Sequence, residues 1–160
     1  METWKESQLK QLTFAKGIDT AYPILLRFAE NLGFNFCAVS VAMPQQVTSL
    51  NTLQINNYPE EWNRQYEQRK FSSIDPITAH GNQSMMPTVW NETLYEKAPH
   101  VWQALQEQGL QHGWSQSFHH KESGLCSILS LARKHCPIRP LELYEHFGYI
   151  FYAASHLSEL

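Results

Sequence analysis

The chain has 160 residues and a formal net charge of −3, with 12 Lys and Arg against 15 Asp and Glu. A chain of this length fits one domain, residues 1–160, and can bury a substantial core. Hydrophobic residues make up 42% of it and aromatic residues 12%, which excludes a disordered segment. The acidic balance, without any basic cluster, argues against a surface that binds nucleic acid.

The same sequence predicts a cytoplasmic protein with no membrane contact. No apolar run reaches the ~18 residues of a membrane span, and residues 1–6 lack the basic and apolar regions of a signal peptide. Cys37, Cys126 and Cys136 cannot all pair and form no C-x-x-C motif, as is typical of free thiols in a reducing compartment.

The first third of the chain predicts two helices and then a β-hairpin, from apolar residues at helical spacing followed by alternating aromatic and β-branched residues. The predicted elements are helices over 4–18 and 19–31 and strands over 34–43 and 47–55. Asp19 or Thr20 is the expected cap of the second helix, and Pro23 falls in its first turn, where the missing N–H costs little. Pro44 begins the expected hairpin turn.

The middle of the chain carries closely spaced aromatic residues. A helix is predicted to begin at Pro59, and Tyr58, Trp62 and Tyr66 recur at intervals of four, so their rings share one face. Asp75 followed by Pro predicts another helix start, because Asp caps a helix and Pro is favoured just inside it.

The last part of the chain returns to alternating helices and strands. The predicted elements are an extended piece over 88–90, helices over 91–97 and 99–108, strands over 113–120 and 125–133, and a long amphipathic helix over 139–160. This order predicts an α/β fold, an α-β-α sandwich whose central antiparallel sheet is flanked by helices on both faces.

The segment from Asn57 to Trp90 carries the informative motifs, N-Y-P-E-E-W-N-R-Q-Y, I-D-P and M-P-T-V-W. With G-F-N-F at 33–36 and Gly113 before the last hairpin, these motifs resemble the N-terminal, autoinducer-binding domain of the LuxR family of quorum-sensing receptors. The resemblance covers nearly the whole chain. It implies a sensory domain that binds an acyl-homoserine lactone and has no enzymatic activity.

The resemblance also implies roles for single residues. The Trp62 indole N–H would donate to the lactone carbonyl, and the Asp75 carboxylate would accept the amide N–H. Tyr58 and Ser130 match positions that hydrogen-bond the amide carbonyl or a 3-oxo group. The expected ligand-binding residues are Tyr58, Trp62, Tyr66, Asp75, Ile77, Trp90, Ser130, Val41 and Leu110, with Val39, Val89 and Leu129 as further candidates for the pocket wall.

These residue types suit an amphiphilic ligand on physical grounds alone. Tyr and Trp combine a large apolar area with one hydrogen-bonding group. The resemblance implies in addition that Tyr66 packs on the acyl chain and Trp90 on the lactone ring. A buried carboxylate such as that of Asp75 is costly unless donors reach it, so it favours a ligand that brings an N–H.

The expected partners follow from the same resemblance. The final helix carries more apolar area than one face requires, and we expect it to form a homodimer surface through Tyr144, Phe147, Phe151 and Tyr152. The alternative is that these residues only pack on the sheet. DNA would be bound only through a C-terminal helix-turn-helix domain of ~60 residues, which we expect to be absent from this chain. We expect neither a cofactor nor a metal ion.

Three other functions compete with this hypothesis. A metal site near His119-His120 and Cys126 is disfavoured because adjacent strand residues point to opposite faces. Nucleophilic catalysis, such as lactone hydrolysis, lacks a G-x-S-x-G elbow. A domain tuned to a different small signal, for example a plant-derived compound, or a dimerisation module that needs no ligand, stays open.

Overall fold

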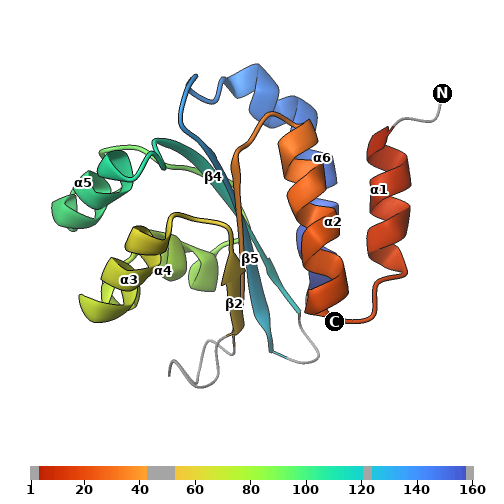
Figure 1. Ribbon diagram of the computed structural model, residues 1–160, viewed down its shortest axis with the longest axis horizontal. Coiled ribbons are helices and arrows are strands. Elements are labelled where there is room, and N and C mark those ends of the chain that lie inside the picture. The colour runs from red at the N-terminus through yellow and green to blue at the C-terminus, as the bar shows by residue number, and fades with distance from the viewer. Residues whose placement is uncertain (1–3, 43–52, 121–123, 158–160) are drawn as a thin grey trace.

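The computed structural model describes residues 4–42, 53–120 and 124–157 (Figure 1). Its elements are α1 (Trp4–Thr13), α2 (Ile18–Asn31), β1 (Phe36–Ala42), β2 (Leu53–Asn56), α3 (Glu60–Gln68), the short 3-10 helix η2 (Phe71–Ser73), α4 (Pro76–Gln83), β3 (Thr88–Val89), α5 (Pro99–Glu107), β4 (His112–His119), β5 (Cys126–Arg133) and α6 (Pro140–Leu157).

The five described strands form one antiparallel sheet in the order β2-β1-β5-β4-β3. Strand β5 lies in the middle, where Ser130 pairs with Ala38 of β1 on one side and with Ser115 of β4 on the other. Nearly all of β5 is buried, because helices cover both faces of the sheet. The predicted α/β sandwich with a central antiparallel sheet is therefore confirmed.

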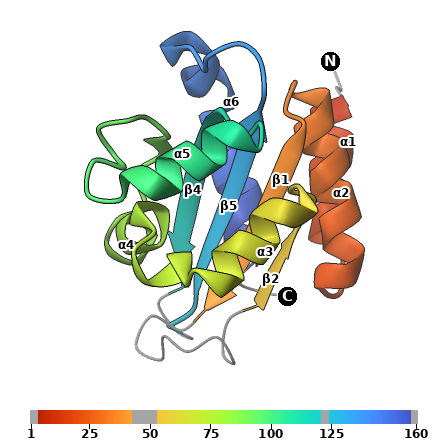
Figure 2. The same cartoon turned by 60° about the vertical axis from the view of Figure 1, so that its left-hand side comes forward.

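The sheet separates two hydrophobic cores. Helices α2 and α6 cover one face, with α1 packed against these two helices, and α3, α4 and α5 cover the other (Figures 1 and 2). Residues of the first core include Leu25, Phe28, Val39, Leu129 and Ile150. Residues of the second core include Trp62, Phe71, Trp90, Leu105 and Ile128. Neighbouring strand residues such as Ile128 and Leu129 fall in different cores, as the alternation of side chains along a strand requires.

Several predicted elements differ from the structure. The predicted helix over 91–97 is wrong, because residues 92–97 form consecutive turns. The Asn91 side chain accepts the Leu94 N–H, and the next backbone bonds join residues three apart. Helix α2 begins directly after Gly17, which has a positive φ of 134°, so Pro23 lies inside the helix and not in its first turn. The predicted turn at Pro44 and most of the strand over 47–55 lie outside the described residues.

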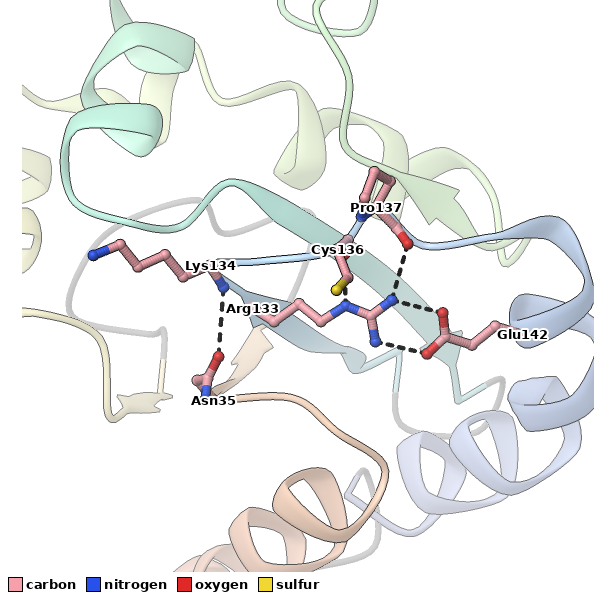
Figure 3. A network of polar contacts seen from close by, with 6 residues as sticks. All are labelled: Asn35, Arg133, Lys134, Cys136, Pro137 and Glu142. Atoms are coloured by element: carbon pink, nitrogen blue, oxygen red, sulfur yellow. Dashed lines mark hydrogen bonds and ion pairs between the residues drawn. The ribbon is translucent and has the colours of Figure 1, made fainter.

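The final helix and the connection that leads to it are tied to the sheet by Arg133 (Figure 3). Its guanidinium donates to both carboxylate oxygens of Glu142, at 2.6 and 2.7 Å, and to the backbone oxygens of Cys136 and Pro137. The same group lies over the Phe34 ring, 5.0 Å from its centroid. One side chain at the end of β5 thus fixes the first turn of α6.

Candidate functional site

A cavity of about 100 Å³ lies in the second core, lined by residues of the sheet and of helices α3 and α4. Seven of the nine residues expected to bind ligand line it together: Tyr58, Trp62, Tyr66, Asp75, Ile77, Trp90 and Ser130. They come from separate stretches of the chain that the fold brings to one place.

Val41 and Leu110 do not line this cavity. Val41 packs against the first core on the opposite face of the sheet, and Leu110 is fully buried elsewhere in the second core. Of the further wall candidates, Val39 lines the cavity although it also belongs to the first core. Leu129 belongs to the first core and does not line the cavity, and Val89 is not part of the wall. Residue type could not separate these positions, because both faces of the sheet are covered and both are apolar.

Helix α3 presents its aromatic residues to the cavity as their spacing predicts. The Trp62 and Tyr66 rings lie 5.7 Å apart, and both contact Phe71, whose ring centroid lies 5.7 Å from that of Trp62 and 6.0 Å from that of Tyr66. Pro59 is the cap residue, so the helix begins at Glu60, one residue later than predicted. Phe71 is fully buried and supports the other two rings from η2.

The two tryptophans of the cavity differ in their indole N–H groups. Trp90 Nε1–H donates to Ser115 Oγ at 2.9 Å, so it is already satisfied inside the protein. For Trp62, the part of the chain that the structure describes offers its indole N–H no hydrogen-bond acceptor. Trp62 can therefore donate to a ligand, whereas Trp90 offers only its ring.

Asp75 caps helix α4 and faces the cavity. Its Oδ1 accepts the Ile77 backbone N–H at 2.9 Å, and its Oδ2 accepts the Tyr66 hydroxyl at 2.8 Å. Burial raises the pKa of Asp75 above its ordinary value, and these two hydrogen bonds act in the opposite direction. An ionised carboxylate has about four acceptor positions, so about two would remain for other donors.

Three tyrosines of the cavity wall interact electrostatically with this carboxylate, and the hydroxyl of one of them, Tyr66, donates to it. Burial and the nearby Asp75 charge raise the pKa of Tyr58, Tyr66 and Tyr95, so each keeps its proton and acts as a neutral donor or acceptor. Tyr95 lines the cavity and is 2% exposed, yet it is not among the predicted site residues. Tyr95 belongs to the segment that was incorrectly predicted as a helix, so its position at the cavity could not be predicted. Leu105 and Ile128 of the wall were missed as well, and no motif marks them.

The backbone of β4 approaches the Trp90 ring closely. Trp90 N–H donates to Gly113 O at 2.8 Å, and a Cβ atom at position 113 would overlap the indole ring. Only glycine leaves room for Trp90 to lie flat against the strand.

Neither a metal site nor a membrane span is found within the described residues. No three His, Cys, Asp or Glu side chains of this part of the chain are grouped to hold a metal ion. None of its helices combines the length and apolar character needed to cross a bilayer.

Comparison with known protein families gives a match over most of the chain. A family model described as "Autoinducer binding domain" matches residues 18–158. The chain belongs to this family. The resemblance that the sequence motifs indicate is confirmed.

Curated relatives of this autoinducer binding domain are named as transcriptional regulators. It is 31% identical to the transcriptional activator protein AnoR of Acinetobacter nosocomialis, over 83% of this chain and 56% of AnoR. It is 31% identical to PhzR of Pseudomonas fluorescens, over 69% of this chain and 45% of PhzR. The chain thus spans about half the length of the curated relatives it matches.

Solved structures show the same fold at lower identity. CepR2 of Burkholderia cenocepacia, an N-acylhomoserine lactone dependent LuxR family factor, superposes with a TM-score of 0.82 at 22% identity, over 95% of this chain and 89% of that chain. SdiA in complex with octanoyl-rac-glycerol gives a TM-score of 0.79 at 23% identity, over 99% of this chain and 68% of that chain.

Proposed function

We propose that this autoinducer binding domain binds an N-acyl-homoserine lactone in the cavity of the second core. One observation carries the proposal: the cavity wall combines an acceptor with free positions, Asp75, with an indole donor that lacks a partner among the described residues, Trp62. A ligand with one amide and one lactone carbonyl complements both groups. Leaving either unpaired in a buried site would cost about 1–3 kcal/mol.

In the proposed pose each polar group of the ligand meets one group of the wall. The amide N–H donates to Asp75, and the lactone carbonyl accepts from Trp62. The amide carbonyl or a 3-oxo group accepts from Tyr58 and Ser130. The Trp90 ring packs on the lactone, which fits an indole N–H that is already bonded to Ser115. Tyr66 packs on the acyl chain.

We infer that binding couples to folding. The cavity encloses about 100 Å³, whereas pockets for small ligands enclose about 300–1,000 Å³. Side chains of the second core therefore have to move apart to admit an acyl chain. A ligand that fills this space and pairs Asp75 stabilises the folded domain by mass action. The gain is about 2.7 kcal/mol at a hundredfold excess over Kd.

We further propose a cytoplasmic homodimer that forms through α6. The outward side of this helix carries apolar residues with large exposed fractions, 61% at Leu141 and 82% at Tyr144. Phe147 and Phe151 stack on each other next to them, with ring centroids 5.8 Å apart. DNA binding is assigned in this proposal to a helix-turn-helix domain outside these 160 residues, which agrees with relatives that are longer and are named transcriptional activators.

A second ligand class is a monoacylglycerol, because the structurally similar SdiA has been solved in complex with octanoyl-rac-glycerol. Such a ligand replaces the amide N–H with hydroxyl donors and has no lactone ring. It therefore belongs in the test beside the lactones.

The test is a thermal-shift panel of N-acyl-homoserine lactones with chains from short to long, with and without a 3-oxo group, and with octanoyl-rac-glycerol as a separate arm. We expect at least one lactone to raise Tm in a concentration-dependent way. A response to the glycerol ester alone would overturn the lactone assignment. A flat response in every arm would favour the dimerisation module that needs no ligand.

A further inference from the structure

Ser115 lies behind the cavity wall, in a hydrogen-bonded chain with two residues of the wall. Trp90 Nε1–H donates to Ser115 Oγ at 2.9 Å, and Ser115 Oγ lies 2.7 Å from Ser130 Oγ. All three residues are buried, and Ser115 is 5% exposed. With so little access to water, their hydrogens have to be shared within the protein.

The direction of donation follows from the hydrogens that each group carries. An indole nitrogen only donates, so Ser115 accepts from Trp90. Ser115 has one hydroxyl hydrogen, and Ser130 Oγ is its remaining partner in the described part of the chain. If Ser130 donated instead, the Ser115 hydrogen would be buried without an acceptor, which proteins avoid.

The neighbouring hydroxyl of Thr88 does not change this assignment. Thr88 pairs with Ser115 across β3 and β4, but its buried hydroxyl oxygen has no hydrogen-bond partner among the described residues. Ser115 therefore donates to Ser130, so the Ser130 hydrogen is left for Tyr58 or for a ligand in the cavity that both residues line. A hydrogen bond from Ser130 in fact acts to lower the pKa of Tyr58, against the effect of burial.

We propose that Ser115 is a positioning residue, which together with Trp90 keeps the Ser130 hydroxyl available as a donor to a ligand, so that this wall selects a carbonyl oxygen. This inference rests on the proposed function and deepens it. One wall, around Ser130 and Tyr58, then requires an acceptor, and Asp75 requires a donor. A secondary amide offers both groups on opposite sides of one bond.

The test is a double-mutant cycle on ligand affinity. Kd is measured for the lactone that most stabilises the wild-type domain, in wild type, Ser115→Ala, Ser130→Ala and the double variant. We expect Ser115→Ala to weaken binding about five- to tenfold, the loss of one directed hydrogen bond. Because Ser115 acts through Ser130, the double variant should bind no more weakly than Ser130→Ala alone.

Two controls separate this role from a general loss of packing. Ser127→Ala removes another buried hydroxyl of β5, which donates to Ala154 O on the other face of the sheet, and should leave Kd unchanged. The N-alkyl analogue, in which CH₂ replaces the amide carbonyl, should bind wild type and Ser115→Ala with the same low affinity. If Ser115→Ala does not fold, Ser115→Cys replaces it as the test variant. Cys has a side chain of similar size but is only a weak hydrogen-bond donor, so this variant should also bind the lactone more weakly than wild type.

The outcomes are distinct. Additive losses in the double variant, or a Ser115→Ala variant that binds the lactone as wild type does, would overturn the role of Ser115 and leave the proposed function intact. If no lactone stabilises the wild-type domain, the proposed function itself fails, and the assignment of Ser115 fails with it.

Discussion

The Tyr66 hydroxyl donates to Asp75 Oδ2 over 2.8 Å and so joins α3 to the cap of α4. The other carboxylate oxygen of Asp75 accepts the Ile77 backbone N–H. These two bonds hold the carboxylate in place but do not compensate its charge fully, because burial still raises its pKa. An ionised Asp75 would therefore carry a net cost in the ligand-free domain, which a ligand N–H would reduce.

Replacement of Asp75 by Asn should separate binding from stability. An Asn side chain still caps Ile77 but carries no charge, so the ligand-free variant should be as stable as wild type or more stable. Lactone affinity should fall by about 1–3 kcal/mol, because a charge-assisted hydrogen bond is lost. Chemical denaturation without ligand and calorimetric titration measure the two effects. A large drop in ligand-free stability would show that the charge itself stabilises the fold.

The raised pKa of Asp75 also predicts that the stability difference between wild type and Asp75→Asn depends on pH. The pKa of Asp75 is higher in the folded than in the unfolded chain, so its protonation favours the folded state. Its contribution to stability is therefore lost as pH rises from the ordinary value of about 3.9 through the folded value. The stability of wild type relative to Asp75→Asn should rise as pH is lowered through this window. Tyr66→Phe keeps the charge but removes a donor, and should be less stable than wild type at neutral pH.

Trp62→Phe tests the indole donor alone. Phe retains an aromatic ring against Tyr66 and Phe71 but lacks the N–H, which has no partner to lose in the described part of the chain. We expect lactone affinity to fall by about 1–3 kcal/mol with little change in ligand-free stability. Unchanged affinity in both this variant and Asp75→Asn would discard the pose.

Gly113→Ala should displace the Trp90 ring, because the added methyl group overlaps it. The expected cost is about 1–3 kcal/mol of stability, as for overpacking in a core, together with weaker lactone binding. Gly148→Ala is the matched control. Its methyl group meets open space inside α6, so it should stabilise the helix by about 0.5–1 kcal/mol. Equal effects of the two substitutions on Tm would contradict the account of Gly113.

The sequence predicts the elements better than the faces on which their residues lie. Spacing by four placed Tyr58, Trp62 and Tyr66 together, and Asp before Pro marked the start of α4. On the strands, however, Val41 and Ile128 are equally apolar, and they lie on opposite faces of the sheet. Only the pairing of β1 with β5 decides which face meets the cavity, and a single sequence does not contain that register.

Tyr95 shows a second limit. Its segment has helical composition, but the Asn91 side chain competes for a backbone N–H and converts the segment into turns. The turns bring Tyr95 to the cavity, where its ring also lies 5.4 Å from that of Trp102. Competition of this kind between side chain and backbone changes the free energy of helix relative to turn by only a small amount. Amino-acid composition does not predict so small a difference.

Arg133→Lys should destabilise the junction between β5 and α6. Lys cannot donate to both Glu142 oxygens and to the two backbone oxygens in one planar arrangement. The ion-paired side chains are only 11% and 21% exposed, so we expect a loss of about 2 kcal/mol in the free energy of unfolding. Arg64→Lys is the matched control. The side chains of its pair with Glu61 are exposed, so Arg64→Lys should not measurably change the free energy of unfolding.

The Arg133 pair also has a pH signature. The hydrogen bonds from Arg133 hold the pKa of Glu142 below its ordinary value. The pair therefore stabilises the fold at a pH above that ordinary value, and this stabilisation is lost as the pH falls through the pKa of the folded state. Glu142→Gln should therefore be less stable than wild type at neutral pH, and the difference should shrink in acid. An unchanged difference from neutral pH to about pH 3 would contradict this assignment.

Tyr144→Glu tests the proposed dimer. Tyr144 is 82% exposed on α6, so a charge there should be tolerated by the monomer but should oppose burial against a second copy. We expect the dissociation constant of the lactone-bound dimer, measured by sedimentation equilibrium, to rise at least about tenfold, with unchanged lactone affinity. Met86→Glu is the matched control, since Met86 is 67% exposed and lies outside α6. If both variants stay dimeric, another surface joins the two copies. If both become monomeric, added charge and not the loss of a specific contact explains the effect.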